Sequence, residues 1–117
     1  MIYLSNAALR YAVNICLESP NYHVVICPEF RSEWGDLIDQ IIDYVPSLAE
    51  NINRATKTKS SNCFIEFSNG SIILFCPAKE NSRGMRANLI IASSKLDKDF
   101  IYAVLLPMEI KQFIEKR

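Results

Sequence analysis

The sequence has little of what catalytic and metal-binding sites are usually built from. It has one histidine, His23, and three glycines in 117 residues, and no G-x-x-x-x-G-K-[ST] segment. Without that segment there is no loop to cradle a phosphate, and without further histidines a zinc site is disfavoured. The four cysteines form no C-x-x-C pair and lie among apolar neighbours. Cys16, Cys27, Cys63 and Cys76 are therefore predicted to be buried free thiols in a reducing compartment.

Net charge is absent as well. Lys+Arg and Asp+Glu number 13 each, whereas proteins that bind nucleic acid generally carry a strong basic excess. The charge is unevenly distributed, with 4 basic and 7 acidic side chains in residues 1–58 and 9 basic and 6 acidic ones in residues 59–117. Any surface that faces phosphate is expected to come from the second half.

Long apolar runs are also missing. No run is long enough to cross a bilayer, and residues 1–17 lack the basic start and apolar core of a signal peptide. The length suits one domain, and a composition that is 50% apolar supplies a core without metals or disulfides. The sequence therefore predicts a single soluble cytoplasmic domain over residues 1–117, with no membrane contact.

Apolar residues recur at helical spacing in two early segments, which predicts two helices. Ser5 is the predicted cap of a helix over 5–18, and Ser32 that of a helix over 32–45. Trp34 in the second helix is predicted to pack in the core, with an interface anchor as the alternative. The aspartates of this helix are predicted to form a solvated face.

Short apolar and β-branched runs predict strands. The predicted strands are 22–27, 63–67, 72–76 and 88–92. Asn69-Gly70 tolerates positive φ at both turn positions, so the second and third of these strands are predicted to form a hairpin.

Three stretches are less distinctive. The polar residues 53–61 fit a loop or an edge strand. Residues 99–106 fit a helix or a strand, and a helix, capped by Asp97 or Asp99, is favoured. Pro107 is predicted to start a final helix. The element order α-β-α-β-β-β-α-α then predicts a small single-domain α/β sandwich with a mixed sheet.

One segment resembles a known family. "FIEFSNGSIILFCPAKENSRGMRANLIIASSK", residues 64–95, is similar to the ATPase core of phage terminase large subunits, the motors that package DNA. In that family a hairpin with an "NGS" turn precedes a loop with an "RG" element and an apolar strand that ends in the Walker B carboxylates. "ALRYAVNICLESPNYHVVICPEF", residues 8–30, resembles the helix and strand that follow the phosphate-binding loop. The resemblance implies a truncated P-loop NTPase core.

The departures from the family pattern determine the expected chemistry. Ser93 and Ser94 occupy the Walker B positions, and hydroxyls supply neither the charge that holds Mg²⁺ nor a base. The family's first strand and phosphate-binding loop would lie upstream of Met1, so the sheet position of that strand is expected to be open. No cofactor, metal or catalytic activity is therefore expected. A serine or cysteine hydrolase is also disfavoured, because no spacing links His23 to a nucleophile.

Three functions remain as predictions. The first is a non-catalytic phage-type protein that binds a partner macromolecule, as an interaction module or as an inhibitor, for example of a host defence system such as a CRISPR nuclease. A protein partner or a homodimer would dock at the open sheet edge. The second is a nucleic-acid-binding module that uses the basic loops 54–59 and 79–86. The third is an NTPase subunit completed in trans. The candidate contact residues are Arg54, Lys57, Lys59, Lys79, Arg83 and Arg86.

Overall fold

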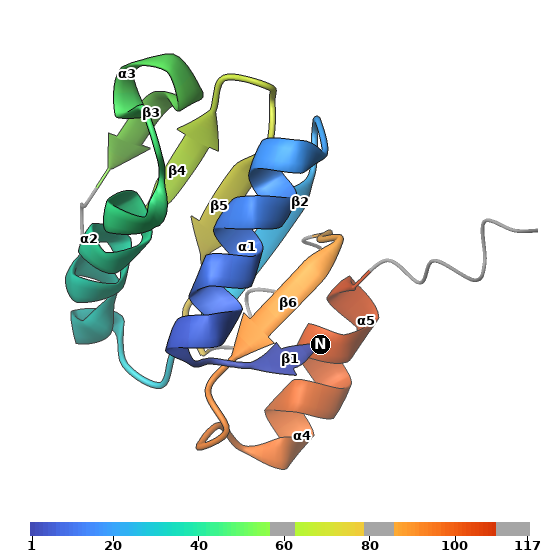
Figure 1. Ribbon diagram of the computed structural model, residues 1–117. Helices are drawn as coiled ribbons and strands as arrows, with labels where there is room; N and C mark the ends of the chain where they lie inside the picture. Colours follow the sequence, from blue (N-terminus) through green and yellow to red (C-terminus); the bar gives the residue numbers. More distant parts are fainter. Residues whose placement is uncertain (57–62, 79–85, 110–117) are drawn as a thin grey trace, which may run out of the picture.

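A computed structural model of the chain describes residues 1–56, 63–78 and 86–109 (Figure 1). Their strands are β1 (Ile2–Tyr3), β2 (His23–Cys27), β3 (Ile52–Thr56), β4 (Phe64–Phe67), β5 (Ile72–Phe75) and β6 (Leu89–Ala92). They form one sheet in the order β1-β6-β2-β5-β4-β3. The first four strands in this order are parallel to one another, and β4 and β3 are antiparallel to their neighbours. The prediction of an α/β fold with a mixed sheet is confirmed.

Helices cover both faces of the sheet. They are α1 (Asn6–Glu18), the 3₁₀ turn η1 (Arg31–Glu33), α2 (Trp34–Tyr44), α3 (Leu48–Asn51), α4 (Lys98–Phe100), the π-helical segment η3 (Ile101–Leu105) and α5 (Leu106–Met108). The last three run on without a break as one C-terminal helix. The buried side chains of α1 and α2 pack on one face, and those of the C-terminal helix pack on the other, over β2 and β6 (Figure 1). No helix in these ranges is both long and apolar enough to cross a membrane.

The central strands explain the continuous apolar runs in the sequence. In β2, Val24 and Ile26 face α1 and α2, while Val25 and Cys27 face the C-terminal helix. A parallel strand that is covered on both faces has no position left for a polar side chain. The strands β4 and β5 instead alternate buried and half-buried residues, because the described helices cover them on one face.

The start of the sheet differs from expectation. The sheet position expected to be empty is occupied by β1, where Ile2 pairs with Ile91 and Tyr3 with Ala92. Two residues are too few to show a strand period, so the sequence pattern missed this element. Residues 53–61, left open between loop and edge strand, contribute β3, the edge strand at the opposite side of the sheet.

One of the two predicted helix caps is confirmed and one is wrong. The Ser5 hydroxyl accepts a hydrogen bond from the amide of Ala8 at 3.1 Å and caps α1. Ser32 caps nothing, because η1 begins before it, and the Glu33 carboxylate accepts from the amide of Phe30 at 2.8 Å instead. A carboxylate oxygen accepts a stronger hydrogen bond from an amide than a hydroxyl oxygen does. The bond to Glu33 therefore favours a helical turn that begins at η1, before Ser32.

The final helix of the prediction is also corrected. The favoured helix near 99–106 exists, with Asp97 in the cap position but without a capping hydrogen bond from its side chain. Pro107, however, lies in the last turn of that helix and does not start another. The preceding turn widens, and the Leu106 amide bonds the Ile101 carbonyl five residues back. Proline has no amide to continue the ladder, and the helix ends one residue later.

The predicted hairpin between β4 and β5 is confirmed, with a different turn. The Phe67 amide donates to the Ser71 carbonyl at 2.8 Å, and the Gly70 amide donates to the Phe67 carbonyl at 3.1 Å. Of the turn residues, all described, only Gly70 has a positive φ, at 89°. This is a three-residue loop with a glycine bulge, and not a two-residue turn with both φ values positive. A side chain at Gly70 would also collide with that of Asn21.

The same turn caps the C-terminus of α1. Asn69 Nδ2 donates to the Cys16 carbonyl at 2.7 Å, and the buried Ser71 hydroxyl donates to the Ser19 carbonyl at 2.6 Å. The Tyr22 amide in turn donates to Ser71 Oγ at 3.1 Å. Carbonyls at a helix end have no partner within the helix, so these bonds satisfy groups that would otherwise be orphaned. The hairpin and α1 are thereby fixed to each other.

We expect Asn69→Ala to lower the free energy of unfolding by about 1–2 kcal/mol, because it removes a hydrogen bond to a helix-end carbonyl and leaves that carbonyl unpaired. Urea unfolding followed by circular dichroism measures the change. Asn53→Ala, at an exposed position of the edge strand β3, is the matched control, with an expected change within about 0.5 kcal/mol. Equal losses in the two variants would contradict the capping role.

The four cysteines are buried and free, as predicted. Burial raises the pKa of Cys16 to about 12 and raises the pKa of Cys63. The pKa of Cys27 is raised by a hydrogen bond with the Cys76 side chain and by burial. Since thiolate is the reactive form, these thiols are inert in the folded chain.

We expect none of the four cysteines to react with Ellman's reagent in native buffer and all four to react after guanidinium denaturation. A thiol that reacts before unfolding would contradict this assignment.

Candidate partner-binding surface

The carboxyl ends of the parallel strands are where an open α/β sheet usually binds its ligand. Here β1 leads into α1 through only Leu4 and Ser5, and the Ser5 hydroxyl itself bonds the helix amide of Ala8. A phosphate-binding loop needs several glycines whose amides surround the phosphate, followed by a lysine. This link has neither residue type, and one amide of the first helical turn, that of Ala8, is already bonded by Ser5.

Ser93 and Ser94 follow β6 at the same end of the sheet. The Ser93 amide donates to the Cys27 carbonyl at 3.0 Å, and its hydroxyl accepts from the Lys95 amide at 3.1 Å. Ser94 is exposed in the turn that follows. Both serines therefore belong to a turn that ends β6 and leads toward the C-terminal helix.

The basic candidates that the structure describes do not meet. Arg54, on β3, pairs with Glu66 at 3.4 Å, and its guanidinium lies 5.3 Å from the centre of the Phe64 ring. Arg86 is exposed just before β6. Three strands lie between β3 and β6, which places these two strands about 19 Å apart at roughly 4.8 Å per strand. The other four basic candidates, Lys57, Lys59, Lys79 and Arg83, lie outside the described residues.

Other chemistry-bearing residues are part of the framework. Trp34 is buried in the core against Phe75, so the core prediction is confirmed and the interface-anchor alternative is wrong. The aspartates of α2 are exposed, as predicted. Within the described ranges, no three His, Cys, Asp or Glu side chains gather where they could hold a metal ion.

A groove that the sequence did not indicate lies between β1 and the C-terminal helix. Its volume is about 230 Å³. The lining residues are Met1, Tyr3, Lys98, Ile101, Tyr102 and Leu106. Tyr3 and Tyr102 are 59% and 67% exposed and belong to segments far apart in the sequence. We name this set of residues the β1 groove. No local motif marks it, because it forms only when the first strand and the last helix meet.

The groove lies beside the edge of the sheet at β1, where no further described strand pairs. The Leu4 amide donates to the Ala92 carbonyl at 2.8 Å, on the inner side of β1. Successive residues of a strand direct their backbone groups to opposite sides, so the amide and carbonyl of Tyr3 point outward. An exposed strand edge next to a groove that takes side chains is the arrangement that extended peptides use when they add a strand to a sheet.

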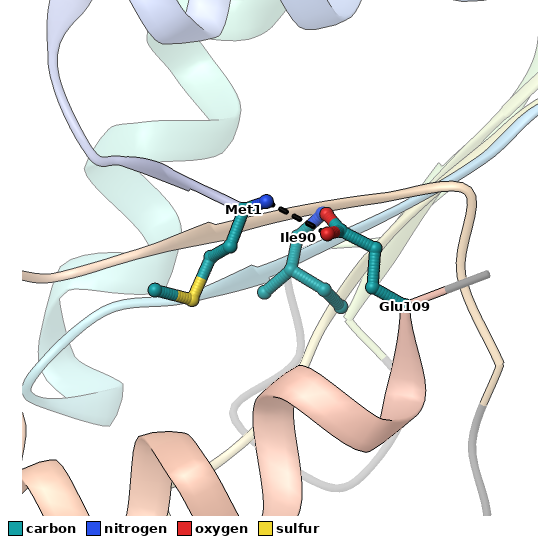
Figure 2. A network of polar contacts seen from close by, with 3 residues as sticks. All are labelled: Met1, Ile90 and Glu109. Atoms are coloured by element: carbon teal, nitrogen blue, oxygen red, sulfur yellow. Dashed lines mark hydrogen bonds and ion pairs between the residues drawn. The ribbon is translucent and has the colours of Figure 1, made fainter. Parts of the chain in front are cut away.

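A buried carboxylate fixes β1 beside the C-terminal helix (Figure 2). Glu109 Oε1 accepts from the N-terminal ammonium of Met1 at 2.7 Å, and Oε2 accepts from the Ile90 amide at 2.9 Å. The side chains of this ion pair are only 11% and 10% exposed. Next to it, the Ala87 amide donates to the Met108 carbonyl at 3.0 Å. Both walls of the β1 groove are therefore anchored to β6 by the same residue.

We expect Glu109→Gln to lower the free energy of unfolding by about 1–3 kcal/mol, because it leaves a nearly buried ammonium without its counter-charge. Amide hydrogen exchange at Leu4 should accelerate in parallel, as β1 detaches from β6. Glu66→Gln, which breaks the exposed pair with Arg54, is the matched control and should change stability by less than about 0.5 kcal/mol. Unchanged Leu4 exchange in Glu109→Gln would show that the carboxylate does not hold β1.

Comparison with known proteins identified no relative of this chain. No protein-family model matches the chain, and no curated protein matches it.

Proposed function

We propose that this chain is a non-catalytic binding protein and that its partner docks at the β1 groove. The observation that carries the proposal is the pair of exposed tyrosines, Tyr3 and Tyr102, around a hollow of mixed polar and apolar lining beside the outer edge of β1. Tyrosine is enriched where proteins bind one another, because its ring offers apolar area and its hydroxyl tolerates water. Elsewhere the described apolar residues lie mainly in two cores.

The ends of the parallel strands support the non-catalytic part. After β1 and β6, the hydroxyls of Ser5 and Ser93 accept hydrogen bonds from backbone amides of their own chain. Neither the link Leu4-Ser5 nor the turn Ser93-Ser94 has a carboxylate that would hold Mg²⁺ or a lysine that would meet a phosphate. The origin of the chain in a terminase-like ATPase core stays a prediction. A role as an inhibitor of a host defence system is likewise a proposal about the partner's identity.

The described basic residues do not favour the nucleic-acid alternative. Phosphate recognition over a duplex needs several free cations on one surface. Arg54 is engaged by Glu66 and Phe64, and Arg86 lies at a distant strand. No observation on the described residues favours an NTPase completed in trans over a binding protein.

The proposal is tested by photo-crosslinking in the organism that encodes the chain. A benzoylphenylalanine replaces Tyr102 in the groove, and in a matched control it replaces Tyr11, an exposed tyrosine on α1. We expect a discrete adduct, identified by mass spectrometry, from position 102 and not from position 11. The adduct should disappear when Tyr3→Ser is added, because that change removes the facing wall of the groove.

Two results would refute this function. One is an identical set of adducts, or none, from positions 102 and 11. The other is tight, Mg²⁺-dependent uptake of ATP or GTP by the purified chain in calorimetry, since the proposal gives the chain no means of holding a nucleotide with its metal.

A further inference from the structure

We infer that the occupant of the β1 groove is an extended acidic peptide segment, which adds to the outer edge of β1 and sets a carboxylate against Lys98. The inference rests on the proposed function and adds the chemistry of the partner. Three features of the groove carry it: the open backbone groups of Tyr3, the size of the hollow and the single charged side chain that lines it.

The backbone selects an extended segment. Tyr3 presents its amide and carbonyl on the outer side of β1, so a strand laid along this edge would form a seventh strand of the sheet. The edge is short, because β1 has two residues. Few backbone bonds are therefore available, and side chains in the groove have to supply most of the affinity and the specificity.

The size of the hollow selects a side chain over a small molecule. Its volume of about 230 Å³ is below the roughly 300–1,000 Å³ typical of small-molecule pockets. Tyr3 and Tyr102 line it together with the apolar side chains of Met1, Ile101 and Leu106. Such a hollow suits one apolar side chain of a peptide whose backbone runs along the edge.

The charge selects an acidic segment. Among the groove residues, all of them described, Lys98 is the one with a charged side chain, and it has no ion pair in the described ranges. The carboxylate of Glu109 is already engaged by Met1 and Ile90. Asp97 and Asp99 line a separate hollow with Ala78 and Phe100. A carboxylate on the partner would thus meet a cation that no ion pair within the described ranges engages.

Charge also argues against a second copy of this chain as the occupant. A two-fold interface sets the same patch against itself, so Lys98 of each copy would approach a groove that offers no free carboxylate.

The opposite edge of the sheet, at β3, is a poorer site for a peptide. At β3, Arg54 already pairs with Glu66 and lies over Phe64.

A random-peptide display library, selected on the purified chain, tests the inference. We expect selected peptides to share an acidic residue at a fixed distance from an apolar one. The same selection on Lys98→Glu should return peptides with a basic residue at that position. In fluorescence anisotropy, Lys98→Glu should weaken an acidic selected peptide by about tenfold or more. Lys95→Glu, an exposed lysine outside the groove, should change its affinity by less than about twofold.

The backbone part has its own test. Tyr3→Pro and Tyr3→Ala both remove the ring, but only proline removes the outward amide, which an edge strand tolerates. Proline should therefore weaken binding about fivefold more than alanine does. Thermal unfolding shows that both variants are folded before their affinities are compared. Equal affinities of the two variants would exclude strand addition.

Other outcomes separate this inference from the proposed function. Selected peptides without acidic preference, no selected peptide at all, or indifference to Lys98→Glu would overturn the acidic-segment inference. A groove-specific adduct at position 102 would still support the binding function in those cases. A dimer in sedimentation that depends on Tyr102 would identify a second copy as the occupant and would also overturn the inference.

Discussion

One carboxylate, that of Glu109, holds the first strand of the sheet beside the last described helix. The strand β1 has two residues and pairs with one neighbour, β6, so its ladder alone provides little stability. Glu109 adds an ion pair to Met1 and a hydrogen bond to the Ile90 amide, in a place largely closed to water, where both are stronger than at the surface. Since the two walls of the β1 groove come from β1 and from the C-terminal helix, this contact helps to hold the candidate surface together.

The sequence predicted the parts of the fold whose apolar pattern is long. The helices α1 and α2 show a repeating apolar stripe, and β2 and β6 show the continuous runs of strands buried on both faces. The sequence pattern failed to predict elements that consist of a few residues and depend on contacts with distant parts of the chain. Nothing local in Ile2–Tyr3 predicts a partner in β6, and the sequence does not show that the helix favoured over 99–106 continues through Pro107, because proline is typical of the first turn of a helix and here lies in the last. The same limit hid the groove, because Tyr3 and Tyr102 carry no shared motif.

The turn Asn69-Gly70-Ser71 shows how one sequence motif serves two purposes. The hairpin at this turn could be predicted from the sequence, because glycine after asparagine favours a tight hairpin, although the glycine bulge could not. The hydrogen bonds of the turn to the carbonyls of Cys16 and Ser19 could not be predicted either, since those groups belong to a helix that ends far earlier in the chain. These bonds give the turn a structural reason to keep its residues wherever such a helix and hairpin meet. Similarity at this turn is therefore an argument about fold, and it carries no information about nucleotide chemistry.

The short β1 also shapes what the surface can recognise. A long open edge would bind many extended segments through backbone bonds, and it would invite aggregation. With Tyr3 as the outward-facing residue of the strand, the backbone contributes little, and discrimination passes to the tyrosine rings and to Lys98. A cation next to an open edge further disfavours unselective pairing, because charged side chains are a common means of protecting sheet edges. The same lysine thus disfavours basic strands, and strands that would cover it without a counter-charge, and favours those that carry an acidic residue at the matching position.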